Sequence, residues 1–263
     1  MSETKVHPYL ADKLNRMHPD MTLALAFVPD GRTLRLSCLL VLAEDLLGLH
    51  YGSREPEVRF NRVRWWHEEW GRLLAGAPRH PLTSGLAAAG TVREPHLNET
   101  LAFAASHDAE ACADVDSLLA PAATIGRALG GVEAELHGNA EDAAAGRVGI
   151  WTEIVALELI LALPRRLAAA EAGLPLTLTA ELQVTRQAAI EDEPTARRIQ
   201  ERLLGDVAEA AGPVAGSDGW ILRTLLRDRA TRWTRSGREP RAFARLLRAW
   251  RAARQVRRSD LQG

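Results

Sequence analysis

The chain has few of the residues that mark several classes of protein. Its 263 residues include only two cysteines, Cys38 and Cys112, both in apolar surroundings. Two such cysteines suggest neither a disulfide framework nor a metal cluster, and they fit a reducing, cytoplasmic location. Lysine is nearly absent as well, since Lys5 and Lys13 are the only ones, so almost every positive charge is a guanidinium.

Long hydrophobic runs and strand-like patterns are also missing. The most apolar stretch, Ile150 to Leu163, is interrupted by Glu153 and Glu158 and is shorter than the roughly 20 residues that cross a membrane. Aromatic residues make up 5% of the chain, and no stretch alternates apolar and polar residues for long. We therefore expect a soluble protein in which this run is a buried helix.

Good helix formers take the place of those missing features. Alanine, leucine, arginine and glutamate dominate, which predicts an all-α protein. No internal repeat or low-complexity linker divides the chain, so we expect one helical domain over residues 1–263. Proline and glycine positions predict helices at about 33–49, 53–74, 82–89, 96–106, 109–136, 150–163, 195–211, 218–233 and 239–254, with a loop at 138–146 and a break at Pro164.

Positive charge gathers near the C-terminal end. The net charge of −1 argues against nucleic acid as the main partner, yet nine arginines and one acid between Arg235 and Arg258 give this segment a charge of +8 (nine minus one). On a helical wheel, one face gathers Phe243, Leu246, Leu247 and Trp250, and the opposite face gathers Arg241, Arg245, Arg248 and Arg251. This pattern predicts a packed helix with a basic outer face. Such a face suits solvent, peripheral contact of residues 239–258 with an anionic membrane, or nucleic-acid phosphates.

Four short motifs follow one another in the first third of the chain. They are Phe27-Val28-Pro29, the helix of residues 34–49, Arg62-Val63-Arg64-Trp65-Trp66, and His80-Pro81. In this order and spacing they resemble the squalene/phytoene synthase family. The resemblance is clearest over residues 20–90 and weaker over 125–154, where Gly126 and Glu141-Asp142 followed by Gly146-Arg147 are similar to the family's second acidic region.

The resemblance implies an isoprenoid-synthase type of bundle, in which helices surround a central apolar cavity. Active members of the family join two allylic prenyl diphosphates in isoprenoid biosynthesis, with Mg²⁺ to neutralise the leaving group. Aspartates at i and i+4 on two facing helices hold the metal there. The substrate-binding residues that the resemblance implies here are Arg62, Trp65, Trp66 and Arg147.

The acidic positions depart from that pattern. Glu44 and Asp45 are neighbours that point about 100° apart, and no acid follows one turn later. In the second region Asp142 remains, preceded by Glu141, while Gly138 stands where the first aspartate is expected. These four acids are the candidate metal ligands, and Mg²⁺ is expected only if the protein is catalytically active.

Several interpretations stay open at this point. A degenerate family member would bind a prenyl lipid or a protein partner, as do relatives with eroded acidic motifs that assist assembly of respiratory complex I. Alternatively, the chain is an active Mg-dependent prenyl-diphosphate transferase, or an unrelated helical protein with a coincidental Trp-Trp motif. Arg62 either pairs with Glu44 or Asp45 or contacts a phosphate, and the tryptophans either pack in the core or line the cavity.

Overall fold

The computed structural model describes residues 8–16, 19–51, 55–106, 112–138, 141–214, 216–217 and 219–261. The structure is 79% helical, and these ranges contain no strand, so the all-α prediction is confirmed. The first helices are α1 (Pro8–Arg16), α2 (Pro19–Leu25), α3 (Asp30–Tyr51), α4 (Pro56–Leu74), α5 (Pro81–Ala89) and α6 (Leu97–Ser106). They are followed by α7 (Val115–His137), α8 (Glu141–Ala168), α9 (Leu176–Leu182), α10 (Arg186–Glu191), α11 (Glu193–Asp206), α12 (Gly219–Ser236) and α13 (Ala242–Asp260).

Helices α7 and α8 form the central pair of the fold. Gly126 faces Thr152 and Gly130 faces Val148, so the two helices run antiparallel. A Cβ atom at Gly130 would lie 2.6 Å from the backbone of Val148, closer than atoms can approach. Glycine is therefore what lets the two backbones come so near. Helix α3 packs against α7 on one side of the pair, and α12 packs against α8 on the other.

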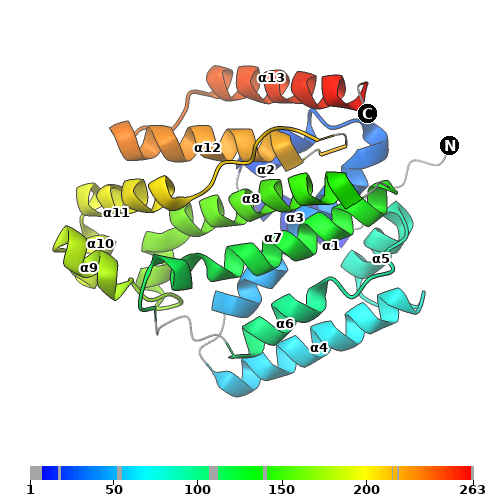
Figure 1. The fold of residues 1–263 in the computed structure, drawn as a ribbon, viewed down its shortest axis with the longest axis horizontal. Helices are drawn as coiled ribbons and strands as arrows, with labels where there is room; N and C mark the ends of the chain where they lie inside the picture. The colour runs from blue at the N-terminus through cyan, green and yellow to red at the C-terminus, as the bar shows by residue number, and fades with distance from the viewer. Residues whose placement is uncertain are drawn as a thin grey trace.

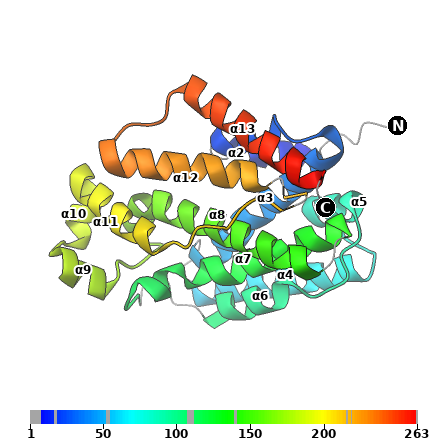
Figure 2. The ribbon, with the colours of Figure 1, turned by 45° about the horizontal axis from the view of Figure 1, so that its top comes forward.

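The remaining helices extend this centre in two directions. Figure 1 shows the order from α4 at the bottom, through α6, α7, α8 and α12, to α13 at the top. Helix α4 packs against α5 and α6, while α13 packs against α12 and α2. In Figure 2, α13 runs obliquely to α12 and passes in front of α2. Helices α4 and α13 thus lie at opposite edges of the molecule.

The apolar core is continuous from α1 to α13. Leu39 and Leu42 of α3, Leu129 of α7 and Trp151 of α8 are fully buried within it. Among the helices that the structure describes, none is both long and apolar enough to cross a bilayer. The structure establishes an all-α architecture. The finer assignment, an isoprenoid-synthase type of bundle, stays a prediction.

Helix α8 is longer than the sequence predicted. Gly146 was expected in a loop and Pro164 at a break, but both lie inside α8. The proline removes one backbone hydrogen bond. Leu163 and Leu167 on either side of it are buried, so packing holds the last turn in helical form despite that loss.

The prediction that the apolar face of α13 packs inward is wrong, and of the arginines predicted on the outer face, Arg241 and Arg251 are exposed while Arg245 and Arg248 turn inward. The buried positions are Ala249, Ala252, Ala253 and Val256. Phe243, Leu246 and Trp250 instead face solvent, with exposed fractions of 76%, 48% and 45%. Small side chains let α13 approach the body closely, and two of its arginines form inward ion pairs with acids of α2 and α12. Those pairs fix the rotation of the helix.

Candidate functional site

The predicted metal ligands have different surroundings. Asp45 forms an ion pair with Lys13 of α1. Glu44 is exposed and lines a cavity of about 210 Å³ between α2, α3 and α8. Glu141 and Asp142 are the first residues of α8, and their side chains fall outside the described residues.

The cavity beside Glu44 has an apolar floor and a charged rim. The floor includes Leu40, Leu47 and Ile154. The charged rim consists of Glu44, Glu158, Arg165, Arg166 and Glu171. Nη1 of Arg166 lies 3.4 Å from Oε2 of Glu171, and its guanidinium carbon lies 4.8 Å from the ring centroid of Tyr51. Ligand pockets usually enclose roughly 300–1,000 Å³, so this cavity is small.

The acids described near α3 do not fit a magnesium cluster. Magnesium takes carboxylate and phosphate oxygens in near-octahedral geometry. Lys13 forms an ion pair with the carboxylate of Asp45. Glu44 shares its cavity with two arginines and two further acids, and Arg166 lies 3.4 Å from one of these acids, Glu171. In the part of the chain that the structure describes, no group of three or more His, Cys, Asp or Glu side chains lies close enough to hold a metal.

Arg62 contacts the backbone rather than an acid. Its Nη1 donates a hydrogen bond of 3.0 Å to the carbonyl oxygen of Gly48, near the end of α3. No ion pair joins it to any described acid, so the predicted pairing with Glu44 or Asp45 is wrong. Arg62 lies opposite the helical turn of α3 that follows those two acids, so its side chain reaches the backbone of that turn instead. Its contact ties α4 to α3.

Trp65 and Trp66 belong to an aromatic cluster with His80. Their ring centroids lie 5.2 Å apart, and that of His80 lies 5.2 Å from Trp65 and 5.9 Å from Trp66. The Nδ1 atom of His80 accepts a hydrogen bond from the backbone N–H of Leu82 and caps α5, which begins at Pro81 as the His-Pro motif predicted. The cluster therefore packs α4 against the start of α5. Neither tryptophan lines the cavity beside Glu44.

Glu69 organises this same corner, a role that no sequence motif predicted. Its Oε1 atom accepts hydrogen bonds of 2.8 Å from the backbone N–H groups of Arg79 and His80, and another from the hydroxyl of Thr83. Arg72 donates to Oε2 at 2.8 Å. Burial acts to raise the pKa of Glu69, but these hydrogen bonds outweigh it and lower the pKa to about 2. Glu69 is therefore a structural carboxylate.

Arg147 lies in a buried polar cluster between α7 and α8. Its Nε atom is 3.8 Å from Oε2 of Glu133, and the same oxygen accepts a 3.0 Å hydrogen bond from the indole of Trp151. Burial, then the nearby Arg35, Arg147 and Arg32, lower the pKa of His137 to about 3, so its imidazole is neutral. Glu133, the ion-pair partner of Arg147, thus lies on α7, whereas Trp65 and Trp66 pack against His80 at the start of α5.

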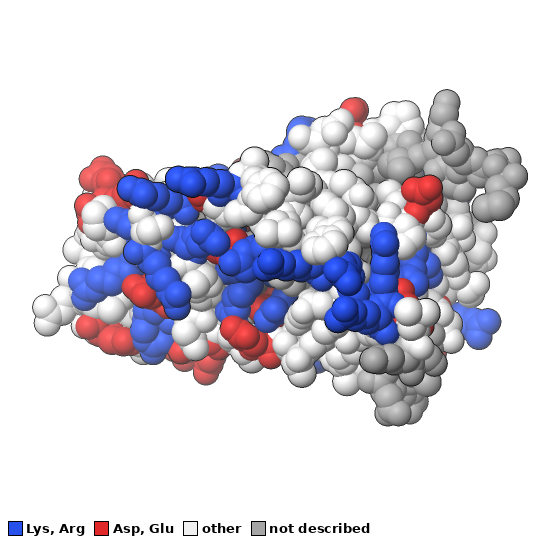
Figure 3. All heavy atoms as spheres, turned by 90° about the horizontal axis from the view of Figure 1, so that it is seen from above, with Lys and Arg blue, Asp and Glu red and all other residues white. Residues whose placement is uncertain are grey.

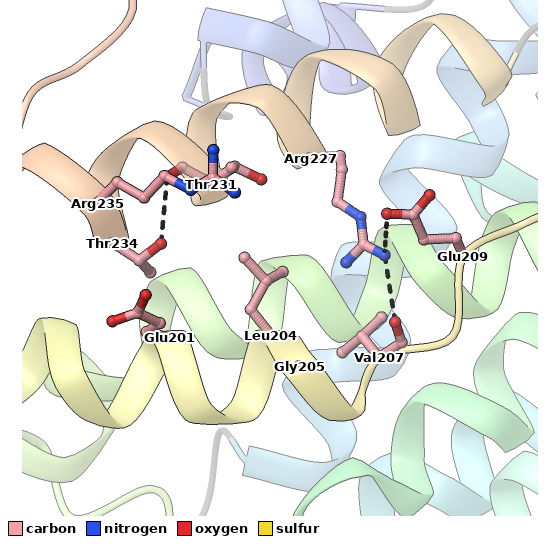
Figure 4. A pocket seen from close by; sticks show the side chains of 9 residues that line it. All are labelled: Glu201, Leu204, Gly205, Val207, Glu209, Arg227, Thr231, Thr234 and Arg235. Carbon is pink, nitrogen blue, oxygen red and sulfur yellow. Dashed lines mark hydrogen bonds and ion pairs between the residues drawn. The ribbon is translucent and has the colours of Figure 1, made fainter.

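A groove of about 380 Å³ between α11 and α12 is lined by two acids and two arginines, and one acid and one arginine of these, Glu209 and Arg227, form an ion pair. Figure 4 shows Arg227 reaching from α12 to Glu209, 3.0 Å away, and to the carbonyl oxygen of Val207 at 3.2 Å. Arg223 and Arg227 also hold the buried Glu153, at 2.7 and 3.1 Å. These contacts brace α8, α12 and the segment that follows α11.

A second groove, of about 870 Å³, lies between α2 and α13. Its lining residues are Asn15, Thr22, Leu23, Ala26, Ala242, Phe243, Arg245 and Leu246. Apolar side chains from both helices dominate, and Nη2 of Arg245 lies 2.7 Å from Oδ1 of the buried Asp20. Sequence reasoning missed this groove because its walls come from opposite ends of the chain. The sequence carries a signal of one wall, the apolar face of Phe243, Leu246 and Trp250 on α13, but the pattern predicted that face to be packed.

Comparisons with known proteins found no match. No protein-family model fits the chain, and searches of curated proteins and of solved structures found none that is similar. The resemblance to squalene/phytoene synthases therefore depends on the motif residues alone.

Proposed function

We propose that this chain is a non-catalytic member of the squalene/phytoene synthase type that binds the hydrocarbon chain of an isoprenoid lipid. The observation that supports binding is the open, apolar groove between α2 and α13. Its volume, about 870 Å³, lies within the range of ligand sites, and its wall of Leu23, Ala26, Phe243 and Leu246 suits a branched hydrocarbon. Asn15 and Thr22 place polar groups at the same groove for a hydroxyl or phosphate head.

The acid positions support binding without catalysis. The Lys13–Asp45 ion pair neutralises one of the two candidate metal-binding acids on α3, and the other, Glu44, lines a cavity of about 210 Å³ that it shares with two arginines and two further acids. Two prenyl diphosphates with their metal ions need more room and more free carboxylates than this. Prenyl transfer remains the competing function, and magnesium dependence distinguishes the two.

Titration with farnesol and farnesyl diphosphate, each with Mg²⁺ and with EDTA, tests the proposal. We expect both ligands to bind with affinities that differ less than tenfold and do not depend on the metal, and no hydrocarbon product. Leu23→Asp places a charge in the groove wall and should weaken both ligands at least tenfold. Leu176→Asp, at an exposed leucine of α9, is the matched control and should bind as the parent does. Turnover that requires Mg²⁺ would reject the proposal in favour of a transferase.

A further inference from the structure

The outer face of α13 combines exposed apolar side chains with arginines. We call this face the α13 outer face and define it by Phe243, Leu246, Trp250, Arg251, Arg254, Arg257 and Arg258, all of them exposed. The aromatic and leucine side chains lie within about 60° of one another around the helix axis, and Arg254 and Arg257 continue the same face toward the C-terminal end. The buried side of α13 is the alanine stripe on the other half of its circumference.

The arginines of this face differ from the inward ones in their partners. Arg245 and Arg248 form ion pairs with Asp20 and Asp228. Within the described ranges, no ion pair joins an acid to any of the four arginines of the α13 outer face. The guanidinium carbon of Arg254 lies 4.8 Å from the ring centroid of Trp250. Figure 3, which views the molecule from this side, shows a band of Lys and Arg side chains, with a few acids among them, beside uncharged surface.

We propose that the α13 outer face docks onto an anionic lipid bilayer. An interfacial helix inserts Trp, Phe and Leu side chains at the level of the lipid headgroups, while arginines extend to the phosphates. Both components are present here on one face. A nucleic acid would engage the arginines but would leave Phe243 and Leu246 in water, so charge and apolarity together favour the bilayer.

Docking through this face would bring the α2–α13 groove to the lipid. Phe243 and Leu246 belong both to the α13 outer face and to the groove wall. The docking proposal is nevertheless independent of the proposed function, because a bilayer surface needs no ligand in the groove. Variants at residues that are not shared distinguish membrane docking from ligand binding in the groove. Trp250 and Arg254 belong to the α13 outer face alone, and Leu23 belongs to the groove alone.

Co-sedimentation of the full chain with vesicles tests the docking. We expect binding to vesicles with 30% phosphatidylserine, little binding to phosphatidylcholine vesicles, and release in 0.5 M NaCl. The triple variant Arg254→Gln, Arg257→Gln, Arg258→Gln should lose at least roughly tenfold in affinity, because each arginine near an anionic surface adds attraction. Trp250→Ser should weaken binding by about tenfold through loss of its indole.

Matched control variants distinguish an effect of the α13 outer face from an effect of the net charge of the protein. Arg64→Gln, Arg79→Gln, Arg93→Gln makes the same charge change at exposed arginines away from α13, and Phe60→Ser removes an exposed aromatic from α4. Both should bind vesicles as the parent does, and circular dichroism should show every variant folded. Failure of the parent to bind anionic vesicles, or equal loss in the control triple variant, would overturn the proposal. So would tight binding to an oligonucleotide that Trp250→Ser leaves unchanged while vesicle binding is absent.

Discussion

The Nε atom of Arg248 on α13 lies 2.8 Å from Oδ2 of Asp228 on α12. The carboxylate of Asp228 is almost completely buried and also accepts from Arg232, at 3.0 Å. This contact turns an arginine of α13 toward the body, and Trp250, two residues further along, consequently points to solvent. Together with the Arg245–Asp20 pair, this ion pair between the last two helices determines which face the last helix presents.

Removing the Asp228 carboxylate should loosen α13. We expect Asp228→Ala to lower the free energy of unfolding by about 1–3 kcal/mol, because two charge-assisted hydrogen bonds are lost. Hydrogen exchange over residues 242–260 should rise. Arg251→Gln is the control, since no described acid pairs with Arg251, and it should change stability by less than about 0.5 kcal/mol. Unchanged exchange in Asp228→Ala would show that the contact does not hold the helix.

The rotation of α13 can be tested by stability alone. Ala252 is 1% exposed, so Ala252→Leu should overpack the contact and destabilise the protein by about 1–3 kcal/mol. Trp250→Ala should change stability by no more than about 0.5 kcal/mol, because its indole is not part of the core. Chemical denaturation measures both. The reverse order would mean that the apolar residues of α13 face inward after all.

The close approach of α7 and α8 should depend on Gly130. Its missing side chain leaves room for the backbone of Val148, so Gly130→Ala should destabilise by about 1–3 kcal/mol. Gly149 offers a control in the same pair of helices, because a Cβ atom there meets nothing within 4 Å. Gly149→Ala should stabilise by up to about 1 kcal/mol through helix propensity. Thermal unfolding distinguishes the two, and equal effects would contradict the close contact.

Glu69 should make the stability depend on acid pH. Its pKa falls to about 2 in the folded protein, against about 4.3 in an unfolded chain. The folded state therefore binds the proton less readily, and the stabilisation is present above about pH 4.3 and is lost as the pH falls toward 2. Glu69→Gln should cost on the order of 2 kcal/mol at pH 7. The difference from the parent should shrink across that acid range.

Glu68→Gln provides the comparison for that pH series. Glu68 is the exposed neighbour of Glu69, and its carboxylate reaches Arg72 only at 3.9 Å. We expect a change of less than about 0.5 kcal/mol at every pH. A pH profile of Glu69→Gln parallel to that of the parent would mean that Glu69 does not titrate as the hydrogen bonds require.

Local signals in the sequence predicted much of the helix order. The helix from Thr33 to Leu49 and the His80-Pro81 start of α5 depend on nearby breakers and caps, and both occur in the structure. Helices α1, α2, α9 and α10 were not predicted, because segments of six to nine residues show too little periodicity. Pro164 misled the prediction for α8, since burial on both sides of it depends on tertiary packing.

The surroundings of the candidate residues depended on contacts that are distant in the sequence. Lys13 and Asp45 are 32 residues apart, and Arg245 and Asp20 are 225 apart. Hydrophobicity alone places Phe243 and Trp250 inside, but alanines and paired arginines occupy the inner side of α13. No local sequence pattern shows which acids elsewhere in the chain will form ion pairs with those arginines.

The most direct test of the account is photo-crosslinking with a farnesol analogue that bears a diazirine, followed by mass spectrometry of the labelled peptides. We expect labels at Leu23, Ala26 and residues 242–246, which farnesol should compete away and which should be equal in Mg²⁺ and in EDTA. Labels at Leu47 or Ile154, in the cavity beside Glu44, would contradict it, particularly if they required Mg²⁺.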